Sequence, residues 1–208
     1  MAQSQSKKQI GKKPEQRLLN FLFEVGTLRK VSRIHRQTLL EDDLSDNIAT
    51  HSFRVAFIGW HLAELEGADS AKVTMMCLMH DLGEARSNDH NWIHKRYVKV
   101  FDHEIIADQF RDLPNGEKLS QIAREYHDRK SVESRIAKDA DLIDQLLLLK
   151  EYVLKGNTEA KLWLDSKLSN KQNQNSFFTK SAVKIANEIK KQKPSEWWEN
   201  VWTSTNRS

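Results

Sequence analysis

Residues 131–156, with the sequence SVESRIAKDADLIDQLLLLKEYVLKG, limit the fold of this chain more than any other segment. Ser131 is a typical N-cap and Gly156 a typical C-terminal stop, so the residues between them are expected to form one long helix. Apolar residues cover nearly its whole circumference, and such a helix has to be buried by neighbouring elements. The segment therefore predicts a long helix in the centre of the protein, covered on most sides.

The rest of the chain has the same helical character. Only seven Gly and three Pro occur among 208 residues, and apolar residues recur at helical rather than alternating spacing. Ser45, Asp46 and Asn47 are candidate N-caps for a helix that ends at Gly67, and Ser70 is a candidate cap for the next helix. The expected helices cover residues 14–31, 45–67, 70–82, 91–112, 116–127, 131–156, 158–168, 178–192 and 195–203. This pattern predicts an all-α, single-domain bundle of about eight to nine helices.

The length suits one domain, which we expect over residues 14–208, after a flexible basic tail over residues 1–13. No run of about 18 apolar residues occurs, and no apolar stretch follows the basic N-terminus, so neither a membrane span nor a secretory signal is expected. Cys77 is the only cysteine, which excludes an internal disulfide and fits a reducing compartment. These features predict a cytoplasmic protein without a membrane partner.

The formal net charge of +4 is unevenly distributed. Residues 1–17 hold five Lys or Arg and one Glu, and residues 171–193 hold six Lys and one Glu. The positive charge thus lies in the expected tail and in one C-terminal segment, as is typical of solvated surfaces. A nucleic-acid partner is therefore not expected.

Three polar residues with metal-ligating side chains follow the apolar residues 77–79. His80, Asp81 and Glu84 lie three and four positions apart, so on a helix they share one face. One imidazole and two carboxylates are part of what a divalent metal site needs. His51 is the candidate second contributor, because it shares a face with apolar residues four and seven positions on. His61 lies about 80° away around the same helix and is less well aligned.

A third contributor is expected from the central helix, whose acids are Asp139, Asp141 and Asp144. Asp139 and Asp141 are about 160° apart on a helix, so both cannot serve one site, whereas Asp141 and Asp144 are about 60° apart and can share a face. A buried carboxylate there needs a metal or a basic partner. His90 and His94 also have chelating spacing, but no third ligand lies near them in the sequence.

The order His51, His80-Asp81, Asp141 resembles that of the HD-domain phosphohydrolases. The stretches LRKVSRIHR, NIATHSFRVAF, MHDLGEARSND and AKDADLIDQLLLLKEYVLKGN are similar to those of bacterial 5′-deoxynucleotidases and related HD-domain-containing proteins of eukaryotes and archaea. The resemblance covers roughly residues 15–155. It implies that the metal ligands are His51, His80, Asp81 and Asp141, and that Glu84 positions or activates the attacking water.

The resemblance also implies a catalytic role for Asp89, an acid that follows in the same loop, and a substrate-binding role for Arg33, which would hold the substrate phosphate. Two departures concern the substrate. Ser87 and Asn88 stand where relatives often have Thr-Gly, and Ile34 stands where the deoxynucleotidases have tryptophan. Lys95 and Arg96 are candidate additional contacts to a phosphate or ribose, and a solvated helix face explains them equally well.

The expected activity is removal of phosphate from (deoxy)nucleoside 5′-monophosphates by a water molecule activated by one divalent ion. The ligand set suits Mn²⁺, Co²⁺, Fe²⁺, Zn²⁺ or Mg²⁺. A (d)NTP triphosphohydrolase or phosphodiesterase on the same scaffold is the first alternative. A non-catalytic metal- or nucleotide-binding module is the second, and the presence of Glu84, Asp89 and Arg33 argues against it.

The sequence does not give the oligomeric state; the resemblance makes a homodimer one possible partner, since relatives commonly dimerise. Trp198 and Trp202 share a face of the last expected helix, which could close the core or bury a subunit interface. Packing into the core is the favoured interpretation.

Overall fold

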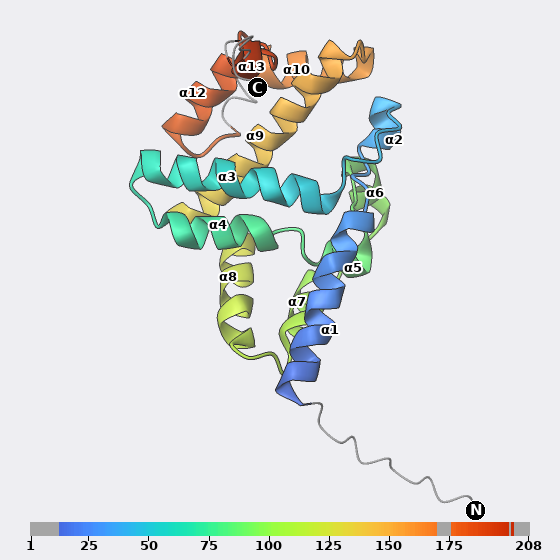
Figure 1. Ribbon diagram of the computed structural model, residues 1–208, viewed down its shortest axis with the longest axis vertical. Helices are drawn as coiled ribbons and strands as arrows, with labels where there is room; N and C mark the ends of the chain where they lie inside the picture. Colours follow the sequence, from blue (N-terminus) through green and yellow to red (C-terminus); the bar gives the residue numbers. More distant parts are fainter. Residues whose placement is uncertain (1–12, 170–175, 200, 202–208) are drawn as a thin grey trace, which may run out of the picture.

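The computed structural model describes residues 13–169, 176–199 and 201, and within these residues the secondary structure is helical apart from one isolated bridge between Ser32 and Asn47. The helices are α1 (Pro14–Thr27), the 3-10 turn η1 (Leu28–Lys30), α2 (Arg36–Leu39), α3 (Ile48–Glu66), α4 (Ser70–Met79), α5 (Glu84–Ser87), α6 (Trp92–Tyr97), α7 (Asp102–Phe110), α8 (Gly116–Asp128), α9 (Val132–Leu154), α10 (Thr158–Ser169), α12 (Lys180–Ile189) and α13 (Glu196–Glu199). The predicted all-α class is confirmed (Figure 1).

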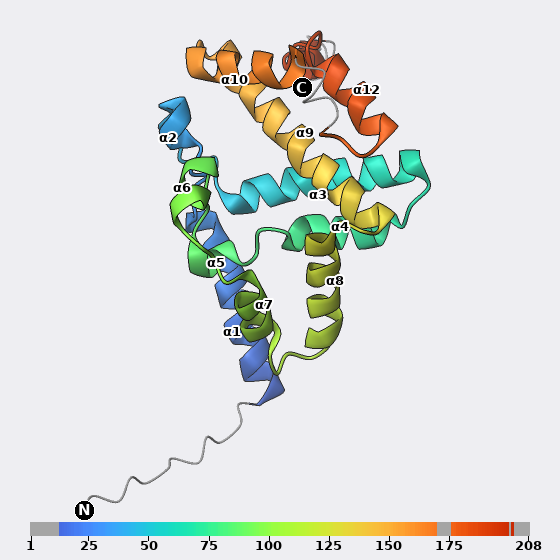
Figure 2. The same ribbon diagram turned by 180° about the vertical axis from the view of Figure 1, so that it is seen from behind.

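Three helices form the centre of the protein. Helices α3 and α4 lie side by side, and α9 packs across both of them, as the view from behind shows (Figure 2). Helices α10, α12 and α13 lie at one end of this group, and α1, α7 and α8 lie at the other (Figure 1). The expectation of a long, largely covered central helix is confirmed by α9, where Ile136, Ala140 and Ile143 are almost completely buried.

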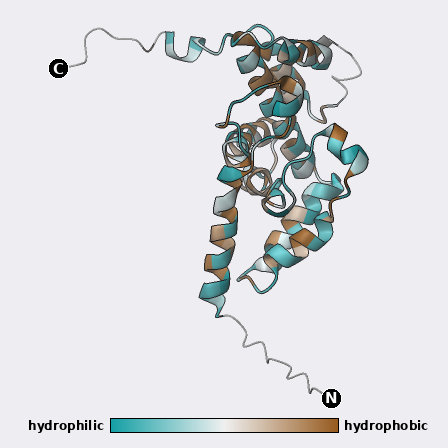
Figure 3. Ribbon diagram, turned by 90° about the vertical axis from the view of Figure 1, so that its right-hand side faces the viewer, coloured by the Kyte–Doolittle hydropathy of each residue, from teal (hydrophilic) through white to brown (hydrophobic). Residues whose placement is uncertain are grey.

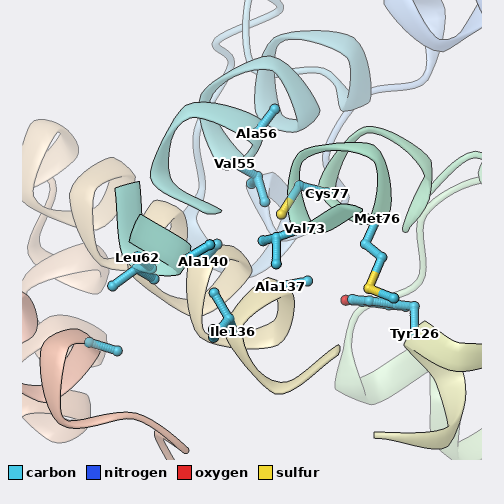
Figure 4. Close-up of a cluster of buried hydrophobic side chains, with 12 residues drawn as sticks. Val55, Ala56, Leu62, Val73, Met76, Cys77, Tyr126, Ile136, Ala137 and Ala140 are labelled. Atoms are coloured by element: carbon cyan, nitrogen blue, oxygen red, sulfur yellow. The ribbon is translucent and has the colours of Figure 1, made fainter. Parts of the chain in front are cut away.

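The contact between the three central helices is made by small and medium-sized apolar side chains (Figure 4). Gly59 lies on the face of α3 that packs against α4. A Cβ added there would lie 2.5 Å from the Cys77 sulfur, 3.0 Å from a Val73 methyl and 3.6 Å from the Ala140 Cβ. The lack of a side chain at Gly59 thus allows α3, α4 and α9 to come together.

Replacing Gly59 with alanine is expected to destabilise the protein by roughly 1–3 kcal/mol, because the extra methyl group overpacks this contact. Gly26→Ala is the matched control, since an added Cβ there meets nothing within 4 Å. In α1 the control should stabilise by about 0.5–1 kcal/mol through helix propensity. Urea denaturation of both variants measures this difference, and equal stabilities would contradict the packing argument.

Several expected helix ends agree with the structure. Asn47 caps α3 by accepting a hydrogen bond from the Thr50 N–H, and Gly67 ends the helix with a φ of 69°. Ser131 caps α9, and Gly156 lies just beyond its end with a φ of 90°. Both glycines occupy the left-handed region, which residues with a Cβ adopt at a cost.

Other boundaries are corrections. Asp69, rather than Ser70, caps α4 by accepting from the Lys72 N–H, and the helix ends at Met79 rather than at Leu82. The single helix expected over residues 91–112 is two helices, α6 and α7. The backbone becomes extended at Val98, where β-branched residues interrupt the helical pattern and help to line a cavity.

The first helix leaves much of its apolar surface uncovered. Figure 3 shows apolar residues in brown among polar ones along α1. Leu19, Leu22 and Phe23 are exposed, while Phe21 and Val25 pack against the cluster around Leu28. One side of α1 thus packs against the rest of the protein, and the apolar residues on its other side are exposed to solvent.

The favoured placement of Trp198 in the core is wrong. Its side chain is 49 % exposed, and that of Trp197 is 78 % exposed, because α13 is a short helix at the surface. Trp202, nearly all of the expected tail and most of the polar segment 169–176 lie outside the described residues. Within the described residues no helix is long and apolar enough to cross a membrane.

Candidate functional site

Three packed helices bring the four expected metal ligands together. His51 lies in the first turns of α3, His80 and Asp81 directly follow α4, and Asp141 lies in the middle of α9. Because α3, α4 and α9 contact one another, residues separated by up to 90 positions meet at one point. The expected inward orientation of His51 is confirmed, since its side chain is buried.

The donor atoms of these residues form a tight cluster. The two imidazole Nε2 atoms of His51 and His80 are 3.1 Å apart, and Asp81 Oδ2 lies 3.5 Å from the first and 3.2 Å from the second. Asp141 Oδ1 lies 3.4 Å from His51 Nε2 and 3.8 Å from His80 Nε2. Ligand atoms about 2.0–2.2 Å from one ion are roughly 3.0–3.5 Å apart, so the spacing of the His51, His80 and Asp81 atoms fits a shared divalent cation. Asp141 Oδ1 lies next to the two imidazoles, somewhat farther from His80 than this range.

The Nδ1 atom of each imidazole, which faces away from the cluster, already has a hydrogen-bond partner. His51 Nδ1 lies 2.6 Å from Asp144 Oδ2, and His80 Nδ1 lies 2.7 Å from the carbonyl oxygen of Cys77. An acceptor at Nδ1 places the proton of a neutral imidazole on that nitrogen and leaves the Nε2 lone pair for the cluster. This is the arrangement typical of metal-binding histidines, so the residues present fit a divalent ion.

The charges of the cluster stabilise each other. Burial alone would lower the pKa of His80, but Asp81 and Asp141 raise it to about 8. Burial also acts to lower the pKa of His51, but Asp141, Asp144 and Asp81 hold it well above its ordinary value. Without an ion the imidazoles therefore bind protons where the metal would otherwise bind.

The carboxylates stay ionised despite their burial, which by itself would raise the pKa of each. His80, together with Arg33, holds the pKa of Asp81 well below its ordinary range. Lys138 and the imidazoles do the same for Asp141, and Lys138 Nζ lies 2.6 Å from Asp141 Oδ2. The carboxylates are thus present in the charged form that a cation needs.

Metal affinity is expected to fall as the pH falls below about 8, because protons and the cation compete for the same nitrogen atoms. Protonation of His80 alone, with its pKa of about 8, predicts a rise in the apparent Kd of about tenfold per pH unit. Titration with Mn²⁺ or Zn²⁺ against a competing chelator from pH 6 to 8.5 measures this slope. His61→Gln should leave the slope unchanged, and a flat profile in the wild type would contradict it.

Asp144 and Arg54 contact the candidate site, and sequence reasoning assigned neither of them a role there. Asp144 accepts from His51 and also pairs with Arg54 Nε, while Arg54 Nη1 contacts Glu151 Oε1 at 2.6 Å. The signal was a charged residue in the otherwise apolar face of α9, three positions from Asp141. Asp144 thereby contacts the His51 nitrogen that faces away from the donor cluster, a position from which it can orient the imidazole.

Asp144→Asn is expected to weaken metal binding by about 10- to 100-fold, because the charge that fixes the His51 ring is removed. Glu151→Gln is the matched control, since it removes the other carboxylate partner of Arg54 without touching His51. Chelator competition gives both affinities. If the two variants bind metal equally well, the orienting role of Asp144 is excluded.

Asp139 lies on the other side of α9, as the angular argument predicted. It is fully buried and accepts hydrogen bonds from the backbone N–H groups of Phe178 and Thr179 and from the Thr179 hydroxyl. Asp139 therefore anchors the segment before α12 and does not reach the donor cluster.

The backbone between His80 and Glu84 corrects the expected continuous helix. It is a tight turn in which the N–H groups of Leu82 and Glu84 donate to the carbonyl groups of Met79 and Asp81, and α5 starts only at Glu84. The i to i+3 bonds still bring Glu84 beside Asp81, so its predicted place at the site is retained by a different local structure.

Glu84 and Arg33 both lie next to the donor cluster, close to the carboxylates of Asp81 and Asp89. Burial, with Asp81 and Asp89, raises the pKa of Glu84 to about 9. Arg33 Nη1 lies 3.3 Å from Asp81 Oδ2, and its Nε lies 3.9 Å from Asp89 Oδ2. Within the described part of the chain, Arg33 Nε and Glu84 Oε2 are buried atoms without a hydrogen-bond partner.

The segment that carries Arg33 is held at both ends. The Arg33 N–H donates to the Asp46 carbonyl group, next to the bridge between Ser32 and Asn47. Asp89 Oδ2 accepts from the Ile34 N–H at 2.8 Å. Asp89 thus contacts the backbone of the Arg33 segment and positions it.

A cavity of about 660 Å³ opens beside the donor cluster. It is lined by residues from many elements, including Arg33, Glu84, Asp89 and Lys95. Arg96 does not line it, because consecutive helical residues point about 100° apart, so the expected contact from Arg96 is not supported. Lys138 and Arg129, which the sequence did not single out, contribute cationic groups to the wall.

Comparison with known proteins gives one family and several relatives. The family described as HD domain matches residues 25–183. A 5′-deoxynucleotidase HDDC2 from Dictyostelium discoideum is 27% identical over 142 residues, which cover 62% of this chain and 72% of that protein.

Solved structures share the fold. A conserved hypothetical protein from Pyrococcus furiosus has a TM-score of 0.67 and 22% identity, covering 84% of this chain and 99% of that chain. A protein described as a predicted metal-dependent phosphohydrolase from Magnetospirillum magnetotacticum has a TM-score of 0.63 and 23% identity, covering 86% and 91%. The cyanophage S-2L HD phosphohydrolase, bound to dA and one catalytic Zn²⁺ ion, has a TM-score of 0.50 and 16% identity, covering 82% and 96%.

Proposed function

We propose that this chain, which belongs to the HD-domain family of metal-dependent phosphohydrolases, removes phosphate from deoxynucleoside 5′-monophosphates. The relative named as a 5′-deoxynucleotidase supports a monophosphate substrate. The fold neighbour bound to dA and a zinc ion supports a nucleoside in the same kind of cavity. The proposal treats the cavity beside the donor cluster as the substrate site.

His51, His80, Asp81 and Asp141 would hold the divalent ion. When bound, such an ion acidifies a water molecule and polarises a phosphoryl oxygen. Two imidazoles and two carboxylates suit Mn²⁺, Co²⁺, Fe²⁺, Zn²⁺ and Mg²⁺ to differing degrees, so the metal has to be assigned by reconstitution.

The residues around the donors supply binding and proton transfer. Arg33 offers a planar guanidinium, whose paired N–H groups match a phosphate, and its Nε has no hydrogen-bond partner among the described residues. Glu84 takes a proton from the attacking water at its buried carboxylate. Lys138 neutralises Asp141 from the cavity side.

The environment of the Glu84 carboxyl group is the main support for a catalytic role of this site. Its Oε2 is buried beside the donor cluster without a hydrogen-bond partner in the described residues, and its charged form is disfavoured by Asp81 and Asp89. A buried, unpartnered carboxyl oxygen is costly, and a site that only stores an ion has no use for it. A divalent ion on the neighbouring donors would favour the charged form of Glu84, in which the carboxylate can accept a proton.

A substrate panel tests the proposal. Metal-free protein is reconstituted with each of the five ions and incubated with (d)NMPs, (d)NTPs and cyclic dinucleotides. Release of orthophosphate from deoxynucleoside monophosphates is the expected result. Release of tripolyphosphate from dNTPs or cleavage of a phosphodiester would move the assignment to the alternative activities, and no turnover with any ion would overturn the proposal.

A further inference from the structure

Two tryptophans form a wall of the same cavity. Trp92 is the first residue of α6 and Trp163 lies on α10, and both line the cavity that contains His80, Asp81 and Asp141. The two indole rings meet edge to face, with centroids 4.9 Å apart and an interplanar angle of 72°. Trp92 is 55 % exposed, so a large aromatic surface is left facing solvent and the cavity.

Hydrogen bonds fix this wall in place. Asn91 caps α6 by accepting from the N–H groups of Ile93 and His94, and it is itself buried. The ring of His35 lies edge to face with Trp163 at 6.2 Å, and His35 Nε2 is 2.9 Å from the buried Asp46 Oδ2. The start of α6 beside Trp92 and a ring neighbour of Trp163 are therefore fixed by hydrogen bonds, which favours a stacking role for this wall.

A polar side chain with unused hydrogen-bonding capacity lies in the same cavity wall. Gln145 is one helical turn beyond Asp141 on α9, it is half-buried, and it lines the cavity. Among the described residues its side-chain amide makes no hydrogen bond. An amide that offers one acceptor and two donors is the group that proteins use to recognise the edge of a nucleobase.

We infer that Trp92, Trp163 and Gln145 form the subsite for the nucleobase. The wall would stack on one face of the base, and the Gln145 amide would hydrogen-bond its edge. The phosphate would lie at the other end of the cavity, beside Arg33 and the metal donors. This inference rests on the proposed function, because it assumes that the phosphate of the substrate is a nucleotide phosphate.

The preference of the enzyme for a substrate with a base over one without a base tests the proposed subsite. The ratio of kcat/KM for a deoxynucleoside 5′-monophosphate to that for 2-deoxyribose 5-phosphate, which lacks the base, is expected to fall about tenfold in Trp92→Ala. Stacking on an aromatic side chain changes affinity by roughly 5- to 150-fold. Trp163→Leu is the second variant and should lower the ratio in the same direction. An unchanged ratio in both variants would overturn the inference.

Trp197→Ala is the matched control, because this tryptophan is exposed on α13 and does not line the cavity. It should leave the ratio at its wild-type value. Gln145→Leu should reduce the differences in kcat/KM among the four deoxynucleoside monophosphates. If those differences persist, Gln145 does not recognise the base.

Binding of free nucleosides separates this inference from the proposed function. Calorimetric titration of the metal-free protein with deoxynucleosides needs neither the ion nor the phosphate. Weaker binding in Trp92→Ala than in the wild type and in Trp197→Ala supports the subsite even if no nucleotide is hydrolysed. Equal binding in all three proteins, or no binding to the wild type, overturns it.

Discussion

Asp141→Ala is expected to abolish metal retention and with it phosphatase activity. The substitution removes a carboxylate, the proposed ligand, whose Oδ1 lies 3.4 Å from His51 Nε2 and 3.8 Å from His80 Nε2. It also leaves Lys138 without its carboxylate partner, which places an unpaired positive charge beside the metal. The loss of activity should exceed the roughly 10- to 100-fold that loss of an outer partner causes. Metal content after dialysis and kcat measured with a fixed metal supply test this expectation.

Asp139→Asn is the matched control for the ligand assignment. Asp139 lies only two residues away on the same helix but contacts Phe178 and Thr179 instead of the donor cluster. The control should keep its metal and lose roughly 1–3 kcal/mol of stability, because an amide cannot accept all of these hydrogen bonds. Equal metal content in Asp141→Ala and in the wild type would show that Asp141 is not a ligand.

Glu84→Gln is expected to keep the metal and to lower kcat by about 10²- to 10⁴-fold, the range for loss of a general base. Glu84 is not one of the four donor residues, and glutamine preserves its shape. KM should change much less than kcat, because the proposed role concerns proton transfer rather than binding.

Glu117→Gln provides the comparison for this second prediction, since Glu117 is an exposed carboxylate paired with Arg124 on α8. Its kcat should match the wild type. Metal content is determined on the same samples used for the kinetics. Full activity of Glu84→Gln with a normal metal content would remove Glu84 from the proposed mechanism.

The sequence predicted the strongly periodic parts of the fold and the four residues whose donor atoms lie close together beside the cavity. The α9 segment was recognisable because its cap, its apolar body and its stop are all local signals. The angular separation of Asp139 from Asp141 followed from helix geometry alone, and the structure places the two residues as that geometry requires.

Features that depend on contacts between distant residues were not predicted. The end of α4 at Met79 and the break at Val98 are set by the turn and cavity that lie around them rather than by a Pro or Gly signal. The exposure of Trp198 was also missed, because helical spacing tells which residues share a face but not whether another element covers that face.

The crowding of functional groups along α9 has a consequence for how proteins with this scaffold can diverge. Asp139, Asp141, Asp144 and Gln145 contact four different partners or surfaces from one uninterrupted helix. Insertion or deletion of a single residue within it would rotate everything beyond that point by about 100° and separate these groups. The segments around Trp92 and Trp163 carry none of the four expected donors His51, His80, Asp81 and Asp141, so changes in length and sequence there are compatible with an intact donor cluster.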